Sequence, residues 1–210
     1  MTLRRPSPLG GRKPLKTDLD LFENDNSTAV DDVLPPGWQE GLAPQLELLL
    51  IGVNPGLWTA AVNAPFARPG NRFWPSLHRA GLTDHQIDAS RGLNPADEQH
   101  LYDRGLGITN LVGRATVRAD QLTREELWAG AERTTELVTR LRPKRAAVLG
   151  ITAYRTAFRQ PKAVLGRQDT TELAGWPDQV PLWVLPQPSG LNAHENIESL
   201  AGHYRAIFTD

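Results

Sequence analysis

Leu46-Glu-Leu-Leu-Leu-Ile-Gly-Val-Asn-Pro-Gly-Leu57 is the stretch that decides how this chain folds. The run from Leu46 to Val53 is almost entirely apolar, and a short run of this kind is typical of a strand that is buried on both faces. Asn54, Pro55 and Gly56 follow at once, and these residue types are common formers of tight turns. The sequence therefore predicts a buried strand that ends directly before Asn54.

Three further apolar runs repeat this pattern, and helical patterns lie between them. The runs cover residues 107–112, 145–149 and 181–185. Strands that alternate with helices pair in parallel, because the helix carries the chain back to the edge where the previous strand began. We therefore expect an α/β fold: a three-layer α/β/α sandwich with a central, mainly parallel sheet of four to five strands.

The clearest helix is predicted for residues 123–141. Thr123 and Glu126 have the spacing of a capping box, in which each side chain bonds the backbone N–H of the other residue. Pro143 follows the end of the pattern, where a helix would stop. Further helices are expected over residues 71–80, 152–159 and 194–208. The apolar face of the clearest helix consists of Leu127, Ala131, Val138 and Leu141.

The chain of 210 residues is long enough for one domain but too short for two of ordinary size. Residues 1–40 are rich in Pro, Gly, Asp and Asn and show no sustained apolar period, so we expect a flexible N-terminal arm there and a single domain over residues 41–210. Residues 1–16 carry five cations and no acid, and residues 17–47 carry eight acids and no cation. The basic end fits two interpretations, a contact with nucleic-acid phosphates or a solvated tail.

The composition excludes several classes of site. The chain has no cysteine, which rules out disulfides, cysteine nucleophiles and cysteine-ligated metal clusters. It has no P-loop, no dinucleotide-binding glycine motif and no histidine pair with ligand spacing, and we expect neither a metal nor a cofactor. No apolar run approaches the roughly 20 residues that span a bilayer, and no apolar segment follows the charges after Met1. We expect a cytoplasmic protein that does not contact a membrane.

Two loops are expected at the carboxyl edge of the sheet, where ligands of α/β folds bind. The first begins with Asn54, although Asn-Pro-Gly is also an ordinary turn. The second, residues 185–194, presents one large apolar side chain, Leu191, between Gly190 and Asn192. An exposed leucine is usually incidental, but it also has the form of a wedge that unstacks bases.

Residues 64–74 mix aromatic residues with arginines, a combination that stacks on bases and binds phosphates. Trp74 is expected in the core, because with Leu77 it forms the apolar face of a helix. Phe66 precedes that helix and is the candidate for a platform under a base.

Three separated segments, Gly52–Leu57, Pro65–Trp74 and Pro188–Asn192, occur in this order. Together they resemble the mismatch-specific uracil-DNA glycosylases, which belong to the thymine-DNA glycosylase branch of the uracil-DNA glycosylase superfamily. The resemblance covers roughly residues 44–208 and includes Gly107–Val112. It implies a monofunctional enzyme that flips a mispaired uracil out of duplex DNA and hydrolyses the N-glycosidic bond with water, which leaves an abasic site. Flipping is needed because the sugar carbon is out of reach in the stack, and it costs less for a mispaired base.

The resemblance also implies roles for individual residues. Asn54 matches the catalytic asparagine, whose neutral amide orients a water molecule more than it removes a proton. Phe66 matches the aromatic residue that stacks on the base. Thr59 falls near the C5 edge of the pyrimidine, where its size would tune the exclusion of thymine. The remaining contacts that the resemblance implies are Val53, Gly56 and Asn110 with the substrate, and Ser189, Gly190, Leu191 and Asn192 with DNA.

Two features depart from the family pattern. Bacterial relatives carry an arginine close to the wedge, whereas Asn192, Ala193 and His194 follow Leu191 here, which weakens the expected grip on the opposite strand. Other branches place a carboxylate where this chain has Asn54, and Asp103 is our hypothesis for an acid that assists from elsewhere. A capping or turn role for Asp103 is equally consistent with the sequence.

The expected partner is double-stranded DNA that contains uracil mispairs, and the expected state is a monomer. Thymine and modified cytosine are further candidate substrates. The alternative from another class is a catalytically weak module that binds lesions or mismatches, since an amide is a poor base. A hydrolase of free nucleotides is disfavoured, because the chain has no phosphate-binding motif and Leu191 would have no purpose.

Overall fold

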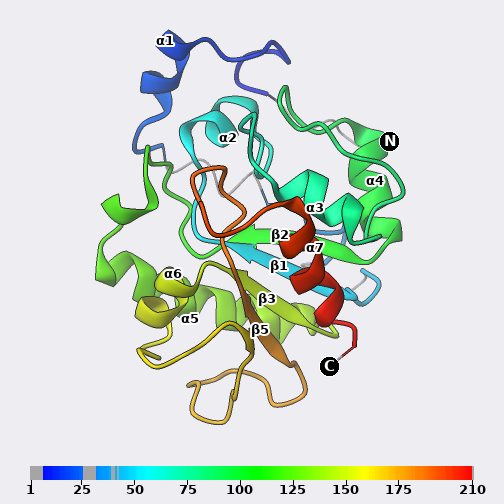
Figure 1. The fold of residues 1–210 in the computed structure, drawn as a ribbon, viewed down its shortest axis with the longest axis vertical. Helices are drawn as coiled ribbons and strands as arrows, with labels where there is room; N and C mark the ends of the chain where they lie inside the picture. Colours follow the sequence, from blue (N-terminus) through cyan, green and yellow to red (C-terminus); the bar gives the residue numbers. More distant parts are fainter. Residues whose placement is uncertain (1–6, 26–31, 39–40, 42, 210) are drawn as a thin grey trace.

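The computed structural model describes residues 7–25, 32–38, 41 and 43–209. At its centre lies a five-stranded sheet in the order β2-β1-β3-β5-β4 (Figure 1). The first four strands of this order are parallel, and β4 is antiparallel to β5. The prediction of a mainly parallel sheet of four to five strands is confirmed. The strands are β1 (Leu48–Gly52), β2 (Leu106–Asn110), β3 (Ala146–Leu149), β4 (Gly166–Arg167) and β5 (Leu182–Leu185).

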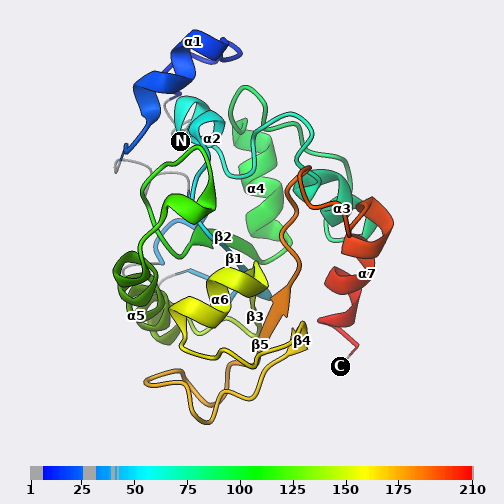
Figure 2. The same ribbon diagram turned by 60° about the vertical axis from the view of Figure 1, so that its left-hand side comes forward.

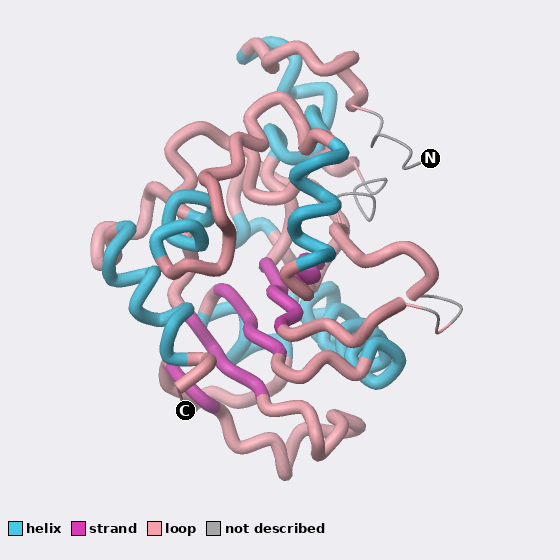
Figure 3. Tube along the Cα trace, turned by 90° about the vertical axis from the view of Figure 1, so that its right-hand side faces the viewer, coloured by secondary structure: helices cyan, strands magenta, loops and turns pink. Residues whose placement is uncertain are grey.

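The described residues form seven α-helices, and Figure 3 shows them on both flanks of the strands. None of the helices is long and apolar enough to cross a lipid bilayer. The helices are α1 (Lys16–Leu19), α2 (Leu57–Val62), α3 (Phe73–Arg79), α4 (Pro95–Asp103), α5 (Arg124–Leu141), α6 (Ile151–Ala157) and α7 (Ile197–Ala206).

The core is divided by the sheet into two layers. Leu48 and Leu50 pack with α3, α4 and α7, whereas Leu49 and Ile51 pack with α5 and α6. This alternation arises because successive side chains of a strand point to opposite faces. Figure 2 shows α5 and α6 on one side of the sheet and α3 and α7 on the other. The three-layer sandwich is therefore confirmed.

Helix α5 begins as the sequence predicts. Thr123 Oγ1 accepts a hydrogen bond from the Glu126 N–H at 3.2 Å, and the Glu126 carboxylate accepts one from the Thr123 N–H at 2.8 Å. Leu127, Ala131 and Val138 are buried, so the apolar face meets the sheet as expected. The capping box thus fixes the start of α5, and the apolar face of α5 packs against the core.

All four predicted strands and all four predicted helices are present with slightly shifted ends, but α1, α2, α4 and β4 were not expected from the pattern, and α1 lies within residues 1–40. The start of α4 carries a recognisable signal, because the Asn94 side chain accepts from the Asp97 N–H at 2.8 Å and Pro95 is the first helical residue. Its buried residues are Leu101 and two acids, so it lacks an apolar period. Helix α2 has six residues and β4 has two, too few for any period to appear.

The described parts of residues 1–40 contact the domain. Val33 is fully buried and exchanges two backbone hydrogen bonds of 2.8 Å with Ile108 in β2. Leu19 and Phe22 pack against Leu57, which begins α2. The flexibility of residues 1–40 stays a prediction, and the arm's first two cations lie outside the described residues.

Candidate active site

The carboxyl edge of the sheet gathers the segments that the sequence analysis singled out. Strands β1 and β2 pair with Gly52 opposite Asn110, and Asn54 comes two residues after the end of β1. The chain leaves β5 at the same edge, and the loop that connects β5 to α7 lies there (Figure 1). The Arg72 N–H donates to the carbonyl oxygen of Pro188 at 2.9 Å, which joins the start of α3 to this second loop.

Gly52, Phe66 and Asn110 meet at one point of this edge. A Cβ atom on Gly52 would overlap the side chain of Asn110 and lie 3.1 Å from Cζ of Phe66, so the close approach requires glycine. Phe66 has a φ angle of 53°, a left-handed conformation that is rare for an aromatic residue. Its ring stacks on Phe73 with 3.9 Å between the ring centroids. These contacts hold the Phe66 ring beside Asn110, as a platform for a flat base requires.

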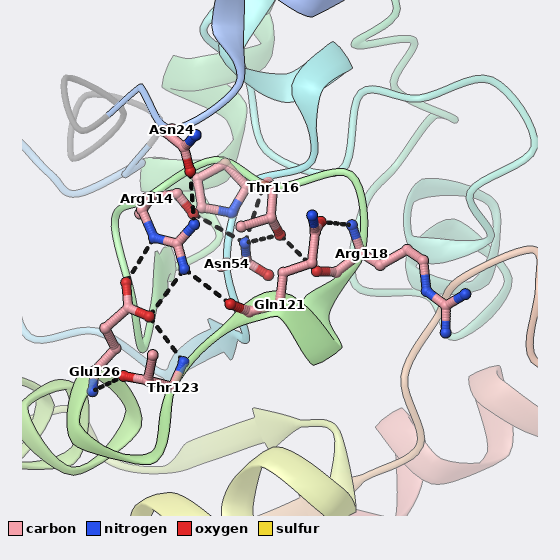
Figure 4. Close-up of polar contacts among 9 residues, drawn as sticks. Asn24, Asn54, Arg114, Thr116, Arg118, Gln121, Thr123 and Glu126 are labelled. Carbon is pink, nitrogen blue, oxygen red and sulfur yellow. Dashed lines mark hydrogen bonds and ion pairs between the residues drawn. The ribbon is translucent and has the colours of Figure 1, made fainter.

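The side chain of Asn54 is held by its amide nitrogen (Figure 4). Nδ2 donates to the carbonyl oxygen of Arg114 at 2.9 Å and to Oγ1 of Thr116 at 2.7 Å, with a longer contact of 3.2 Å to the carbonyl oxygen of Pro55. The Thr116 hydroxyl donates its own proton to the carbonyl oxygen of Arg118 at 2.8 Å, so Oγ1 accepts from Asn54.

This polarity determines which way the Asn54 amide faces. All its partners are acceptors, and turning the amide around would bring Oδ1 against their lone pairs. Oδ1 receives no hydrogen bond from any residue within the described ranges. It is therefore the atom of Asn54 left to bind a water molecule or a substrate group.

Arg114 ties the acceptor loop, residues 114–118, to helix α5. Nε of Arg114 donates to one carboxylate oxygen of Glu126 at 2.6 Å, and Nη2 donates to the other at 2.9 Å. Arg114 lowers the pKa of Glu126 to about 2; the N–H of Thr123 adds to this, and burial opposes it. The carboxylate is therefore ionised at neutral pH, and the pair anchors the loop (Figure 4).

The other residues predicted to bind the substrate are close to Asn54 in the sequence, but their exposure to solvent differs. Thr59 is buried in α2, and its Oγ1 accepts from the N–H of Ala67, next to Phe66, at 3.4 Å. Gly56 precedes α2, and a Cβ there would meet only open space. The Val53 side chain packs in the core layer of α5 and α6, so it belongs to the core.

The insertion loop, residues 187–195, is held by the guanidinium group of Arg72. Nη1 and Nη2 of Arg72 donate to four backbone carbonyl oxygens of this loop, the shortest at 2.8 Å. One planar group with several donors is suited to such a task, because it can reach several carbonyls from a single position. The four carbonyls belong to Ser189, Gly190, Asn192 and Glu195.

Leu191 projects from the insertion loop into solvent. Its side chain is 80% exposed, the most of any large apolar residue in the described part of the chain. A Cβ atom on Gly190 would lie 2.6 Å from the carbonyl oxygen of Gly70, so the loop approaches the segment before α3 too closely for a side chain at this position. The Ser189 Oγ accepts from the Leu191 N–H at 3.2 Å, and Asn192 closes a turn by donating its N–H to the Ser189 carbonyl at 3.0 Å.

Asp103 lies at the opposite edge of the sheet from Asn54, so the structure does not bring these two side chains together. It ends α4 and precedes β2, and because β1 and β2 are parallel this is the amino edge. Its carboxylate accepts from Nε2 of Gln99 at 2.8 Å, and it lines a hollow with Glu47, which directly precedes β1. The local role within its own helix is the one that the structure supports.

Sequence reasoning missed the residues that hold the two loops. The sequence shows Arg72 only as part of an aromatic and basic segment, and no motif contains Arg114 or Thr116. Their partners are distant in sequence, 62 residues in the case of Asn54 and Thr116. A usable signal existed for Arg114 and Thr116, because they follow β2 at the edge where Asn54 follows β1.

A comparison with known protein families shows the family of this chain. Residues 40–207 match the model of the uracil DNA glycosylase superfamily. The match spans the whole sheet, the Asn54 turn and the insertion loop. With most of its length matched, this chain belongs to the uracil DNA glycosylase superfamily.

Proposed function

We propose that this protein is a monofunctional DNA glycosylase that removes uracil from mispairs in double-stranded DNA by hydrolysis. Membership in the superfamily supports a glycosylase that acts on DNA. The observation that carries the finer proposal is the anchored amide of Asn54. Its Nδ2 is bonded to Arg114 and Thr116, and none of the described residues donates to its Oδ1. Asn54 comes two residues after Gly52, where Phe66 and Asn110 meet.

In the proposed reaction, Oδ1 of Asn54 accepts a hydrogen bond from a water molecule and aims its oxygen at C1′ of the flipped nucleotide. As the bond from C1′ to N1 breaks, its electron pair leaves with the uracil, and the sugar gains positive charge. The water oxygen then forms the new bond to C1′, and its surplus proton passes to solvent, because a neutral amide does not hold it. The amide contributes geometry more than basicity.

The base itself would occupy the point where Phe66 and Asn110 meet. The Phe66 ring offers a flat apolar surface, and base stacking on an aromatic ring is worth about 1–3 kcal/mol. We propose that Asn110 contacts the pyrimidine edge and that Thr59 sets how much room remains beside C5. Thr59 fits this role because it holds the backbone next to Phe66.

Leu191 would fill the space that the flipped base leaves in the duplex. Its exposure suits insertion into DNA, because a buried side chain would have to be released first. A mispaired base costs less to unstack than a paired one. This difference supports the proposed preference for mispairs, and one wedge per chain is compatible with action as a monomer.

The test is single-turnover cleavage of 5′-labelled DNA, followed by alkali to reveal abasic sites. The substrates are duplexes with G·U, A·U or G·T and a single strand with U, each with wild type and Asn54→Ala. Preferential G·U cleavage that collapses in the variant is expected. Equal cleavage of every uracil context would overturn the mispair preference. Binding without any cleavage would replace the enzyme with a lesion-binding module.

A further inference from the structure

The loop that holds Asn54 is itself held by the N-terminal segment. The Asn24 N–H donates to the carbonyl oxygen of Ala115 at 3.0 Å, and the Ala115 N–H donates to the carbonyl oxygen of Asp25 at 3.0 Å. Ala115 is fully buried and stands between Arg114 and Thr116, the two residues that accept from the Asn54 amide. Residues 24 and 25 therefore fix the middle of the acceptor loop.

The side chain of Asn24 adds a second link to the same loop. Its Oδ1 accepts from Nη1 of Arg114 at 2.8 Å (Figure 4). Asn24 has a φ angle of 63°, a left-handed conformation that asparagine tolerates better than most residues. This turn lets both the backbone N–H and the side chain of Asn24 point at the acceptor loop.

Arg114 is committed to this structural task. All three nitrogens of its guanidinium group donate to protein acceptors, which are Asn24, Glu126 and the carbonyl oxygen of Gln121 at 3.0 Å. A cation used in this way is a poor candidate for a phosphate contact, because it would have to give up a paired carboxylate.

Apolar contacts bring the N-terminal segment to the other side of the Asn54 turn. Leu19 and Phe22 pack against Leu57 and Ala60 of α2 and against Ala115. Helix α2 starts three residues after Asn54, so the same short segment touches both the element after the turn and the loop that the turn bonds. The N-terminal segment thus contacts the acceptor loop and α2 in three ways: through backbone hydrogen bonds, through the hydrogen bond between Asn24 and Arg114, and through an apolar cluster.

We propose that Leu19, Phe22 and residues 24–25 form a brace that positions the Asn54 amide, with Asn24 as its positioning residue. This inference rests on the proposed function, since it assigns a purpose to the orientation of Oδ1. Asn24 does not touch the reacting atoms; it acts through Arg114 and Ala115. Removing its side chain leaves the acceptor loop freer to move, so the water is aimed less often at C1′.

The experiment uses the full chain and three variants. Asn24→Gly removes the side chain and suits the left-handed backbone, Asn24→Asp retains an acceptor for Arg114, and Leu21→Ala is the matched control on the same segment, with a side chain that is 77% exposed. Single-turnover excision of uracil at saturating enzyme is measured beside the Kd for DNA with an abasic site and the midpoint of thermal unfolding.

We expect Asn24→Gly to lower the excision rate roughly tenfold with a Kd within about twofold of wild type. Asn24→Asp is expected to restore most of the rate, and Leu21→Ala to leave it unchanged. Arg114→Lys, which retains the charge but cannot span Asn24 and Glu126, is expected to match the loss in Asn24→Gly, and it tests the brace separately if Asn24→Gly lowers stability. A wild-type rate in both Asn24→Gly and Arg114→Lys would overturn the proposal, as would an equal loss in Leu21→Ala.

A second readout separates this proposal from the proposed function. The side-chain amide resonance of Asn54 in an NMR spectrum, identified by its loss in Asn54→Ala, reports on the hydrogen bonds of Nδ2 without any substrate. We expect it to shift and to exchange faster with water in Asn24→Gly. If wild type cleaves no DNA but this shift occurs, the proposed function fails and the brace stands. If cleavage occurs and the resonance stays in place, only the brace fails.

Discussion

The acceptor loop and the insertion loop lie at the same edge of the sheet but are secured in different ways. Residues 114–118 are bonded from three directions: by Asn54, by the N-terminal segment and by Glu126 of α5. Residues 187–195 depend mainly on one guanidinium group, that of Arg72, and they present Leu191 to solvent.

This difference follows from what each loop has to do in the proposed reaction. A water-positioning amide contributes only if it is oriented before the substrate arrives, because any reorientation would be added to the barrier. A wedge has to enter a duplex and leave it again, so it must stay outside the core. The two loops are therefore held by separate sets of hydrogen bonds, and each loop can be tested by itself.

The largest effect is expected from Asn54→Ala, which removes the oriented oxygen. The excision rate should fall by at least roughly a hundredfold, because the water loses its only proposed guide. Binding to DNA with an abasic site should stay near the wild-type value, since the insertion loop is untouched. Single-turnover rates and fluorescence anisotropy measure the two quantities.

Asn54→Asp sharpens this prediction. The variant retains an oxygen at Oδ1 but replaces the donor Nδ2 with a second acceptor, which would face the carbonyl oxygen of Arg114. We expect the side chain to turn away and the rate to fall well below wild type. A wild-type rate in Asn54→Asp would show that the hydrogen bonds to Arg114 and Thr116 are not what orients the active oxygen.

The next largest effect is expected from Arg72→Lys. An ammonium group cannot reach the four carbonyls that the guanidinium group bonds, and hydrogen bonds to a charged group are worth about 1.5–3 kcal/mol. We expect a lower midpoint of thermal unfolding and roughly tenfold weaker binding to mispaired duplex DNA. If stability falls while binding and excision persist unchanged, the insertion loop has no part in DNA recognition.

Leu191→Ala should have a smaller and more selective effect. The side chain is 80% exposed, so thermal unfolding should be unchanged. Excision from duplex DNA should slow roughly fivefold, whereas excision from a single strand should stay the same, because no vacated stack needs filling. Val164→Ala, at another exposed apolar residue with 67% exposure, is the control. Equal slowing on both substrates would argue against a wedge.

Local signals in the sequence account for most of the fold and for part of the site. Apolar runs located β1, β2, β3 and β5, and the pair Thr123 and Glu126 located the start of α5. The rule that ligands bind at the carboxyl edge led to Asn54, whereas Asp103 precedes its strand and lies at the other edge. The network around Arg114 could not be predicted, because it joins four segments whose contacts form only when the sheet is assembled.

The smallest effect is expected from the ion pair behind the acceptor loop, and only in acid. Folding lowers the pKa of Glu126 from its ordinary value of 4.5 to about 2, mainly through Arg114. A lowered pKa in the folded state stabilises the protein above the ordinary value, and this contribution is lost as the pH falls from about 4.5 towards 2. Wild type should therefore lose stability over this range more steeply than Glu126→Gln, which has no proton to take up.

The pair formed by Arg12 and Asp18 also responds to acid, because Asp18 has a pKa lowered to about 2. This pair is present in both wild type and Glu126→Gln, so the difference between their curves of stability against pH isolates the contribution of Glu126. Thermal unfolding followed at several pH values supplies these curves. Parallel curves would mean that Arg114 does not depend on a charged partner at position 126, and the acceptor loop would then be held chiefly by the N-terminal segment and by Asn54 itself.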